Sequence, residues 1–175
     1  LMHSQKLSSQ LFNQYVKTLE NQSMRGQMTK IEELKEKAKV GWASFISFEA
    51  LTSTAAPKLV QFSGARQGMK LLDVACGTGV VALTASRQGL EVEGIDLTPE
   101  LIIRANENSK IMGLKAKFVE GDAEFLPYKE KEFDIVLSQY GHMFAPRPTV
   151  VVKELARVLK PGGILAFSTW PKELF

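Results

Sequence analysis

The stretch that most constrains this chain is Met69–Gly79, which reads MKLLDVACGTG. Its LLDV portion is apolar enough for a buried strand, and Gly77 and Gly79 interrupt it before a helix-like run, Val80–Ala85. A strand that breaks on glycines and continues as a helix leaves a nest of backbone amides at the helix N-terminus. A Cβ would keep a ligand away from this backbone. The sequence therefore predicts a strand–loop–helix binding site.

Acidic residues around this loop limit the class of ligand that it can bind. Read alone, GTGVVA matches the dinucleotide pattern G-x-G-x-x-A, which leaves a nicotinamide-dependent oxidoreductase open. However, Asp73 lies four residues before Gly77, where a carboxylate would repel a pyrophosphate and attract a cationic sulfonium and an amino group. Asp96 closes the next strand-like run, 96 − 79 = 17 residues beyond Gly79, about where a ribose-binding acid belongs. Asp122 follows a third such run.

Five stretches match a known family in order and spacing: LLDVACGTG, VEGIDLTPELI, FVEGDAEFLPY, FDIVLSQYGHMFAP and ELARVLKPGGILAFSTW. They run from Leu71 to Trp170. On them, the chain resembles the class I S-adenosylmethionine-dependent methyltransferases, in the methyltransferase type 11 group typified by ubiquinone and menaquinone methyltransferases. The resemblance implies S-adenosyl-L-methionine as cofactor, S-adenosyl-L-homocysteine as product, and a small-molecule or lipid-like acceptor such as a quinone.

Strand and helix patterns alternate along this region, which predicts an α/β fold with a doubly wound, Rossmann-like parallel sheet. The expected strands are Lys70–Val74, Glu91–Asp96, Ala116–Glu120, Phe133–Ser138 and Ile164–Thr169. The expected helices between them are Val80–Gln88, a helix from Pro99 that Gly113 ends, and Pro148–Lys160, after which Pro161–Gly163 should turn the chain into the last strand.

The expected core, residues 65–175, is shorter than the resembled family's. That family continues into an antiparallel hairpin, for which no sequence follows Phe175. We therefore expect a truncated core whose last strand is an exposed edge. Because acceptor-binding elements of the family lie in the same region, we expect such a chain to bind cofactor and to transfer methyl groups poorly.

Residues 1–64 are expected to form an N-terminal helical segment. Residues 1–28 predict a modest amphipathic helix or a frayed terminus, with Leu7, Leu11, Phe12, Tyr15 and Leu19 on one face. Lys30–Val40 predicts a stronger helix, and Pro57 is expected to open another that ends at Gly64. Between them, apolar side chains recur every three residues at Trp42, Phe45, Phe48 and Leu51. Such a stripe either fills the core or, as the resemblance implies for Trp42 and Phe45, covers the cofactor and lines the acceptor pocket.

The resemblance also assigns the site residues. It implies that Asp96 binds the ribose hydroxyls, that Asp122 and the Ala123 amide bind adenine, and that Asp73 holds the loop or meets the amino group through water. The full cofactor-binding set is Asp73, Ala75, Cys76, Gly77, Thr78, Gly79, Asp96, Leu97, Asp122, Ala123, Glu124 and Ser138. His142 and Tyr140 are the catalytic candidates after the fourth strand, and no metal is expected. A lone strand-end aspartate is more often a turn residue, and Cys76 reads as a packing residue.

Composition limits the remaining classes of function. The chain is 45% hydrophobic and 23% charged with a net charge of +3, which is too slight an excess to argue for nucleic acid. One cysteine, no run of about 20 apolar residues and no signal-peptide core favour the cytoplasm and no membrane span. SQYG replaces the motif of amino-directed nucleic-acid methyltransferases after the fourth strand. A homodimer through the N-terminal helices or the sheet edge, and a non-catalytic cofactor-binding module, stay open.

Overall fold

The computed structural model describes residues 24–169. The chain divides into two compact units, Leu1–Ala38 and Lys39–Phe175. Residues 24–43 are helical, so the expected helix Lys30–Val40 is part of a longer one. The amphipathic face predicted from Leu7 to Leu19 lies outside the described residues.

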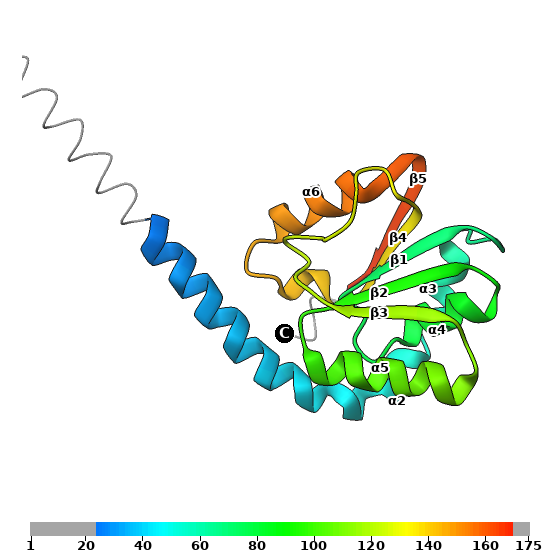
Figure 1. The fold of residues 1–175 in the computed structure, drawn as a ribbon, viewed down its shortest axis with the longest axis horizontal. Helices are drawn as coiled ribbons and strands as arrows, with labels where there is room; N and C mark the ends of the chain where they lie inside the picture. The colour runs from blue at the N-terminus through cyan, green and yellow to red at the C-terminus, as the bar shows by residue number, and fades with distance from the viewer. Residues whose placement is uncertain (1–23, 170–175) are drawn as a thin grey trace, which may run out of the picture. The chain divides into compact units, whose positions relative to one another are not determined.

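A five-stranded parallel sheet forms the centre of the second unit (Figure 1). Its spatial order is β3-β2-β1-β4-β5, and every neighbouring pair is parallel. The strands are β1 (Lys70–Val74), β2 (Glu91–Asp96), β3 (Ala116–Glu120), β4 (Phe133–Gln139) and β5 (Leu159–Ser168). The order reverses direction between β1 and β4, the place where doubly wound sheets bind ligands at the carboxyl ends of their strands. The predicted Rossmann-like fold class is confirmed.

Helices cover both faces of this sheet. They are η1 (Ser44–Phe48), α2 (Glu49–Ser53), α3 (Ala56–Phe62), α4 (Val80–Arg87), α5 (Pro99–Met112), η2 (His142–Phe144) and α6 (Pro148–Val158). Apolar side chains of α3, α4 and α5 pack with Leu71, Ile135 and Leu137 on one face. Those of α6 pack with Leu72 and Val136 on the other. Burial on both faces explains why the central strands read as nearly continuous apolar runs.

The KPGG segment differs from its prediction. Helix α6 ends at Val158, and β5 begins at once with Leu159, so Pro161–Gly163 belongs to a strand and not to a turn. Phe133 pairs with Leu159 but Ile135 pairs with Ile164, so the extra residues bulge out of the ladder. A proline without an amide donor and a glycine at φ 77° suit a bulge, which needs fewer ladder bonds.

The stretch after residue 43 is also less regular than predicted. Of the four apolar residues spaced by three, Phe45 and Phe48 lie in the 3₁₀ helix η1 and Leu51 in the short helix α2, while Trp42 lies in the last turn of the helix before them. A 3₁₀ helix has three residues per turn, which matches the spacing only within η1. Helix α3 then starts at Ala56, one residue before the predicted Pro57.

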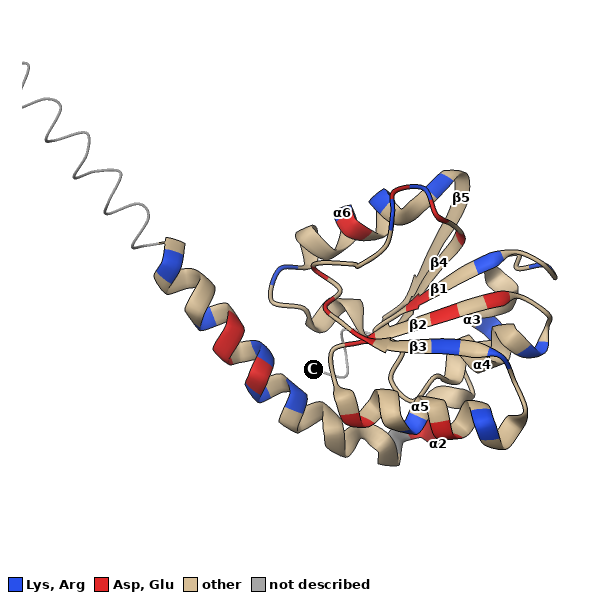
Figure 2. Cartoon of the chain, in the orientation of Figure 1, with Lys and Arg blue, Asp and Glu red and all other residues tan. Residues whose placement is uncertain are grey.

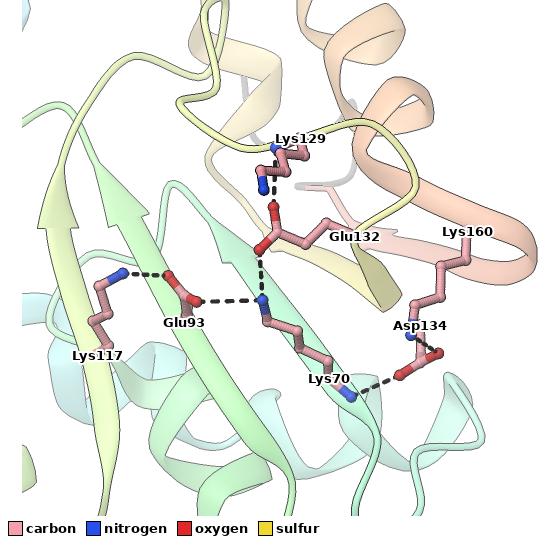
Figure 3. Close-up of polar contacts among 7 residues, drawn as sticks. All are labelled: Lys70, Glu93, Lys117, Lys129, Glu132, Asp134 and Lys160. Carbon is pink, nitrogen blue, oxygen red and sulfur yellow. Dashed lines mark hydrogen bonds and ion pairs between the residues drawn. The ribbon is translucent and has the colours of Figure 1, made fainter.

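Charged side chains form a cross-strand ladder toward the amino ends of the strands (Figures 2 and 3). Glu93 accepts from Lys117 at 3.0 Å and lies 3.6 Å from the ammonium of Lys70, which also donates to Glu132 at 2.6 Å. The Lys70 amide and the Lys160 ammonium both donate to Asp134. Alternating charges on neighbouring strands stabilise their pairing, so this edge has a structural role.

Residues 24–169 have neither a membrane-spanning helix nor a cluster of metal-binding side chains. No helix within residues 24–169 is long and apolar enough to cross a membrane. In the same part of the chain, no three His, Cys, Asp or Glu side chains gather closely enough to hold a metal ion.

Candidate functional site

The glycine loop connects β1 to α4 at the carboxyl edge of the sheet. Ala75, Gly77 and Gly79 all adopt positive φ, at 57°, 55° and 84°. The Cys76 amide donates to the Ile95 carbonyl at 3.0 Å, which ties the loop to the neighbouring strand. A Cβ built on Gly77 would meet no protein atom within 4 Å. The space beside Gly77 is therefore open, and ligand binding at this loop stays a prediction.

Asp73 holds the start of α4 and retains one unused oxygen. Its Oδ2 accepts the Ala82 amide at 3.0 Å, which satisfies one of the helix's unpaired N-terminal donors. Its Oδ1 has no hydrogen-bond partner among the described residues. Burial raises the pKa of Asp73 to about 8, and the nearby Asp96 carboxylate adds to this effect. A cationic ligand would relieve the cost of burying this charge.

Asp96 connects the glycine loop to the beginning of α5. Its Oδ2 accepts the Gly77 amide at 2.8 Å, and its Oδ1 accepts the Thr98 amide at 2.9 Å. Burial raises the pKa of Asp96, although both amides oppose that shift. Each carboxylate oxygen has a second lone pair, so Asp96 can still accept hydrogen bonds from a diol.

The first two acidic residues of the loop after β3, Asp122 and Glu124, have different hydrogen-bond partners. Asp122 Oδ1 accepts the Glu124 amide at 2.9 Å in a local turn. The fully buried Glu124 accepts the Arg147 amide at 2.7 Å and its guanidinium Nη2 at 2.7 Å. The Glu124 side chain thus holds the start of α6, and a cofactor contact from this residue stays a prediction.

Other predicted members of the cofactor set have defined surroundings. Cys76 packs in the core beside Gly94, and burial raises the pKa of its thiol well above the usual value. The packing role predicted for Cys76 agrees with both observations. The backbone carbonyl of Thr78 accepts a hydrogen bond from the side-chain amide of Asn108 at 3.1 Å. Leu97 is half-buried.

The catalytic candidates follow β4. Tyr140 is a non-glycine residue at φ 59°, a strained conformation of the kind that clusters at functional sites. The His142 amide donates to Ser138 Oγ at 3.2 Å, and its ring packs 4.6 Å from that of Phe167. Burial lowers the pKa of His142, and its Nδ1 has no partner among the described residues. Neutral imidazole can accept a proton.

The segment from Lys39 onward meets several of these strand ends. Lys39 pairs with Glu120 at the end of β3 at 3.7 Å. The Trp42 ring lies 4.9 Å from that of Phe144 in η2 and 5.2 Å from that of Phe45. Trp42 therefore packs against η2, the short helix that contains His142, and Phe45 packs against Trp42.

Sequence reasoning missed Gln139. The Gln139 Nε2 donates to the Thr52 carbonyl at 2.9 Å, and Gln139 as a whole is only 8% exposed. A polar side chain at the carboxyl end of the apolar run FDIVL was the available indication, but the predicted strand ended one residue earlier, at Ser138.

The family comparison decides the affiliation of this chain. The family described as "Methyltransferase domain" matches residues 72–167, more than half of the chain and all of the strand ends described above. The chain belongs to this family. As a class I methyltransferase domain, it has S-adenosylmethionine as its cofactor.

Individual relatives and structures agree with this affiliation. The methyltransferase domain is 44% identical over 127 residues to an uncharacterized protein of Mycobacterium tuberculosis, covering 73% of this chain and 46% of that protein. It is 39% identical over 111 residues to demethylmenaquinone methyltransferase of Staphylococcus aureus, covering 62% and 46%. A SAM-dependent methyltransferase structure from Aquifex aeolicus has a TM-score of 0.61 at 26% identity, covering 65% of this chain and 63% of that one. The chain spans about half the length of these curated relatives.

The described residues fit this cofactor. S-adenosylmethionine has a ribose diol, a cationic sulfonium and an ammonium. Asp96 retains lone pairs for the diol, and the buried Asp73 Oδ1 is an unpaired acceptor suited to a cation. Gly77, which has open space beside it, donates its backbone amide directly to Asp96.

Proposed function

We propose that this methyltransferase domain binds S-adenosylmethionine at the glycine loop and transfers its methyl group to a small-molecule or lipid-like acceptor. The observation that carries the proposal is the pair of buried carboxylates, Asp73 and Asp96, on adjacent strands at the loop. The pyrophosphate of a dinucleotide would be repelled by each of these carboxyl groups that is ionised, whereas a cationic ligand would favour their ionisation. The match to the methyltransferase family also argues against a nicotinamide-dependent oxidoreductase.

Each side chain has a distinct role in this proposal. Asp96 accepts hydrogen bonds from the ribose hydroxyls, and Asp122 accepts one from the adenine amine while the Ala123 amide donates to the ring. Asp73 faces the cationic end of the cofactor. The bonds from Asp73 to Ala82 and from Asp96 to Gly77 fix both carboxylates before the ligand arrives, and preorganisation of this kind reduces the entropy cost of binding.

The cofactor supplies an activated methyl group, so the protein mainly needs to position the acceptor. An acceptor hydroxyl must also lose its proton. His142 is the base that we propose, because its pKa is lowered by burial and it stays neutral at physiological pH. Tyr140 and the following residue direct the chain from β4 toward the loop, where Gly141 packs against Ala75.

The acceptor class is inferred from the relatives. Demethylmenaquinone methyltransferase of Staphylococcus aureus is named for a lipid-like quinone. A related acceptor for this domain agrees with the aromatic contact between Trp42 and Phe144, which offers flat apolar surfaces.

Calorimetry tests the cofactor proposal directly. We expect S-adenosylhomocysteine to bind the chain and NADH not to bind. Binding of NADH without either S-adenosyl compound would refute the proposal.

Methyl transfer needs a separate assay, with radiolabelled S-adenosylmethionine and a panel of hydroquinone, phenol and amine acceptors. We expect His142→Gln to reduce transfer to a hydroxyl by about 100-fold or more while leaving S-adenosylhomocysteine affinity unchanged. Unaltered transfer by this variant would exclude His142 as the base. Cofactor binding with no transfer to any acceptor would favour a non-catalytic binding module.

A further inference from the structure

The carboxyl ends of β4 and β5 carry a pair of polar residues that the proposed function does not use. Gln139 and Ser168 are partners in the parallel register of the two strands. Their side chains therefore project from the same face of the sheet. The preceding residues in the same alternation, Leu137 and Ala166, lie in the core under α3 and α4. An apolar face thus ends in an amide and a hydroxyl at the edge where ligands bind.

Both polar groups have an unused hydrogen-bonding atom. Gln139 Oε1 and Ser168 Oγ are buried, and neither has a partner among residues 24–169. The amide of Gln139 has a defined orientation, because its Nε2 donates to the Thr52 carbonyl at 2.9 Å. Its oxygen is consequently the free end. Buried polar atoms in native proteins almost always have partners, so these two unpaired atoms on neighbouring strands are available to a polar group of a ligand.

The position of this pair separates it from the cofactor residues. Apart from Ser138 on β4, the cofactor set follows the ends of β1, β2 and β3, whereas Gln139 and Ser168 lie on β4 and β5, on the other side of β1 in the sheet. The pair is nevertheless close to the glycine loop, because Gly141, two residues after Gln139, packs directly against Ala75. A molecule held here lies next to the cofactor loop and does not compete with the cofactor's diol.

We propose that Gln139 and Ser168 bind a hydroxyl group of the methyl acceptor, one other than the hydroxyl that loses its proton to His142. This inference rests on the proposed function and specifies the acceptor as an uncharged aromatic compound with two hydroxyl groups, of the hydroquinone kind. The hydroxyl donates its proton to Gln139 Oε1 and accepts the proton of Ser168 Oγ. A methyl ether cannot make the first bond, because it has no proton to donate. A carboxylate would be repelled by the amide oxygen.

Phenol and anisole are matched probes of this site, since they differ only in the hydroxyl proton and one methyl group. Their binding is measured by ligand-observed NMR titration of the full chain saturated with S-adenosylhomocysteine. We expect the wild-type chain to prefer phenol by at least about fivefold, as one hydrogen bond to a buried partner provides. The preference should fall to about one in Gln139→Leu, which removes the acceptor of the hydroxyl proton. Ser168→Ala should instead weaken the binding of both probes by about fivefold and keep the preference, because the oxygen of either probe can accept from Ser168 Oγ.

Ser168→Ala removes a single unpaired oxygen and no described hydrogen bond, so it tests the second contact without disturbing the first. Gln139→Leu also loses the bond to Thr52, so S-adenosylhomocysteine calorimetry checks that each variant is folded. A wild-type chain that binds the two probes equally, a phenol preference that persists in Gln139→Leu, or unchanged binding of both probes in Ser168→Ala would overturn the inference. Failure of the wild-type chain to bind S-adenosylhomocysteine would instead count against the proposed function.

Discussion

At Asp73, one carboxylate oxygen caps helix α4 and the other lacks a partner among the described residues. This side chain is 1% exposed, and its pKa is raised from 3.8 to about 8. A raised folded-state pKa means that the folded chain binds more protons than the unfolded chain. The stability that this group contributes is therefore complete below about pH 4 and is lost as the pH rises to about 8.

The first prediction concerns Asp73→Asn, which keeps an acceptor for the Ala82 amide and cannot ionise. Between about pH 5 and about pH 8, the unfolding free energy of the wild type should fall relative to the variant by up to about 1.4 kcal/mol per pH unit. Urea denaturation without cofactor measures this difference. Parallel pH profiles for the two proteins would show that Asp73 does not titrate in this range.

A second prediction concerns Asp96. In Asp96→Asn, an NH₂ group replaces one carboxylate oxygen. This group faces the backbone amide of Gly77 or of Thr98, which is also a donor, and it cannot accept a hydrogen bond from the ribose. Loss of one charge-assisted hydrogen bond costs about 1.5–3 kcal/mol, which corresponds to about 10- to 150-fold weaker S-adenosylhomocysteine binding.

Calorimetry of Asp96→Asn is compared with that of Glu93→Gln. Glu93 lies on the same strand but belongs to the charged ladder near the amino ends of the strands (Figure 3). The control should bind S-adenosylhomocysteine like the wild type. Equal affinities for all three proteins would remove Asp96 from the ribose site.

At the scale of elements, β1 and β4 come together just beyond their paired residues. Gly141 has no side chain, and this allows the segment after β4 to pack against the Ala75 Cβ in the glycine loop. Because Ala75 itself adopts φ 57°, the loop has little freedom to move away. The conformation of the cofactor loop therefore depends on a residue 66 positions later in the chain.

The third prediction follows from this contact. Gly141→Ala should destabilise the chain by about 1–3 kcal/mol, as overpacking does, and should weaken S-adenosylhomocysteine binding by displacing the loop. Denaturation and calorimetry measure the two effects. Gly41→Ala is the matched control, because Gly41 is helical and has no atom within 4 Å of the added Cβ. It should stabilise the chain by up to about 1 kcal/mol. Tolerance of Gly141→Ala would contradict the tight packing.

At the scale of the whole molecule, every residue of the candidate site lies in the unit Lys39–Phe175. This unit contains the complete five-stranded sheet and the helices on both of its faces. It also contains Trp42, with its contacts to Phe45 and Phe144. Cofactor binding should therefore depend on this unit.

The fourth prediction is that removal of residues 1–38 leaves S-adenosylhomocysteine affinity within about threefold of the full chain, a difference below about 1 kcal/mol. Calorimetry on both forms is the measurement, and circular dichroism confirms that the shorter form is folded. A much larger loss of affinity would mean that the first unit takes part in the site.

Local patterns were sufficient to predict the sheet and the cofactor loop. Apolar runs ending in Asp73, Asp96 and the residues before Asp122 identified strands, and glycines and prolines marked where helices begin and end. Parallel strands bring their carboxyl ends to one edge, so the convergence of these acidic residues also followed from the sequence. The predicted bounds of β1, β2 and β3 agree with the structure.

Tertiary structure decided the features that depend on residues far apart in the chain. Glu124 pairs with Arg147, 23 positions away, and Gln139 bonds to Thr52, 87 positions away. No local periodicity reports such contacts. The KPGG segment formed a bulge because its pairing with β4, and not its own turn propensity, sets its conformation. Likewise, only packing leaves Gln139 Oε1 and Ser168 Oγ buried without partners, since burial depends on which elements cover a side chain.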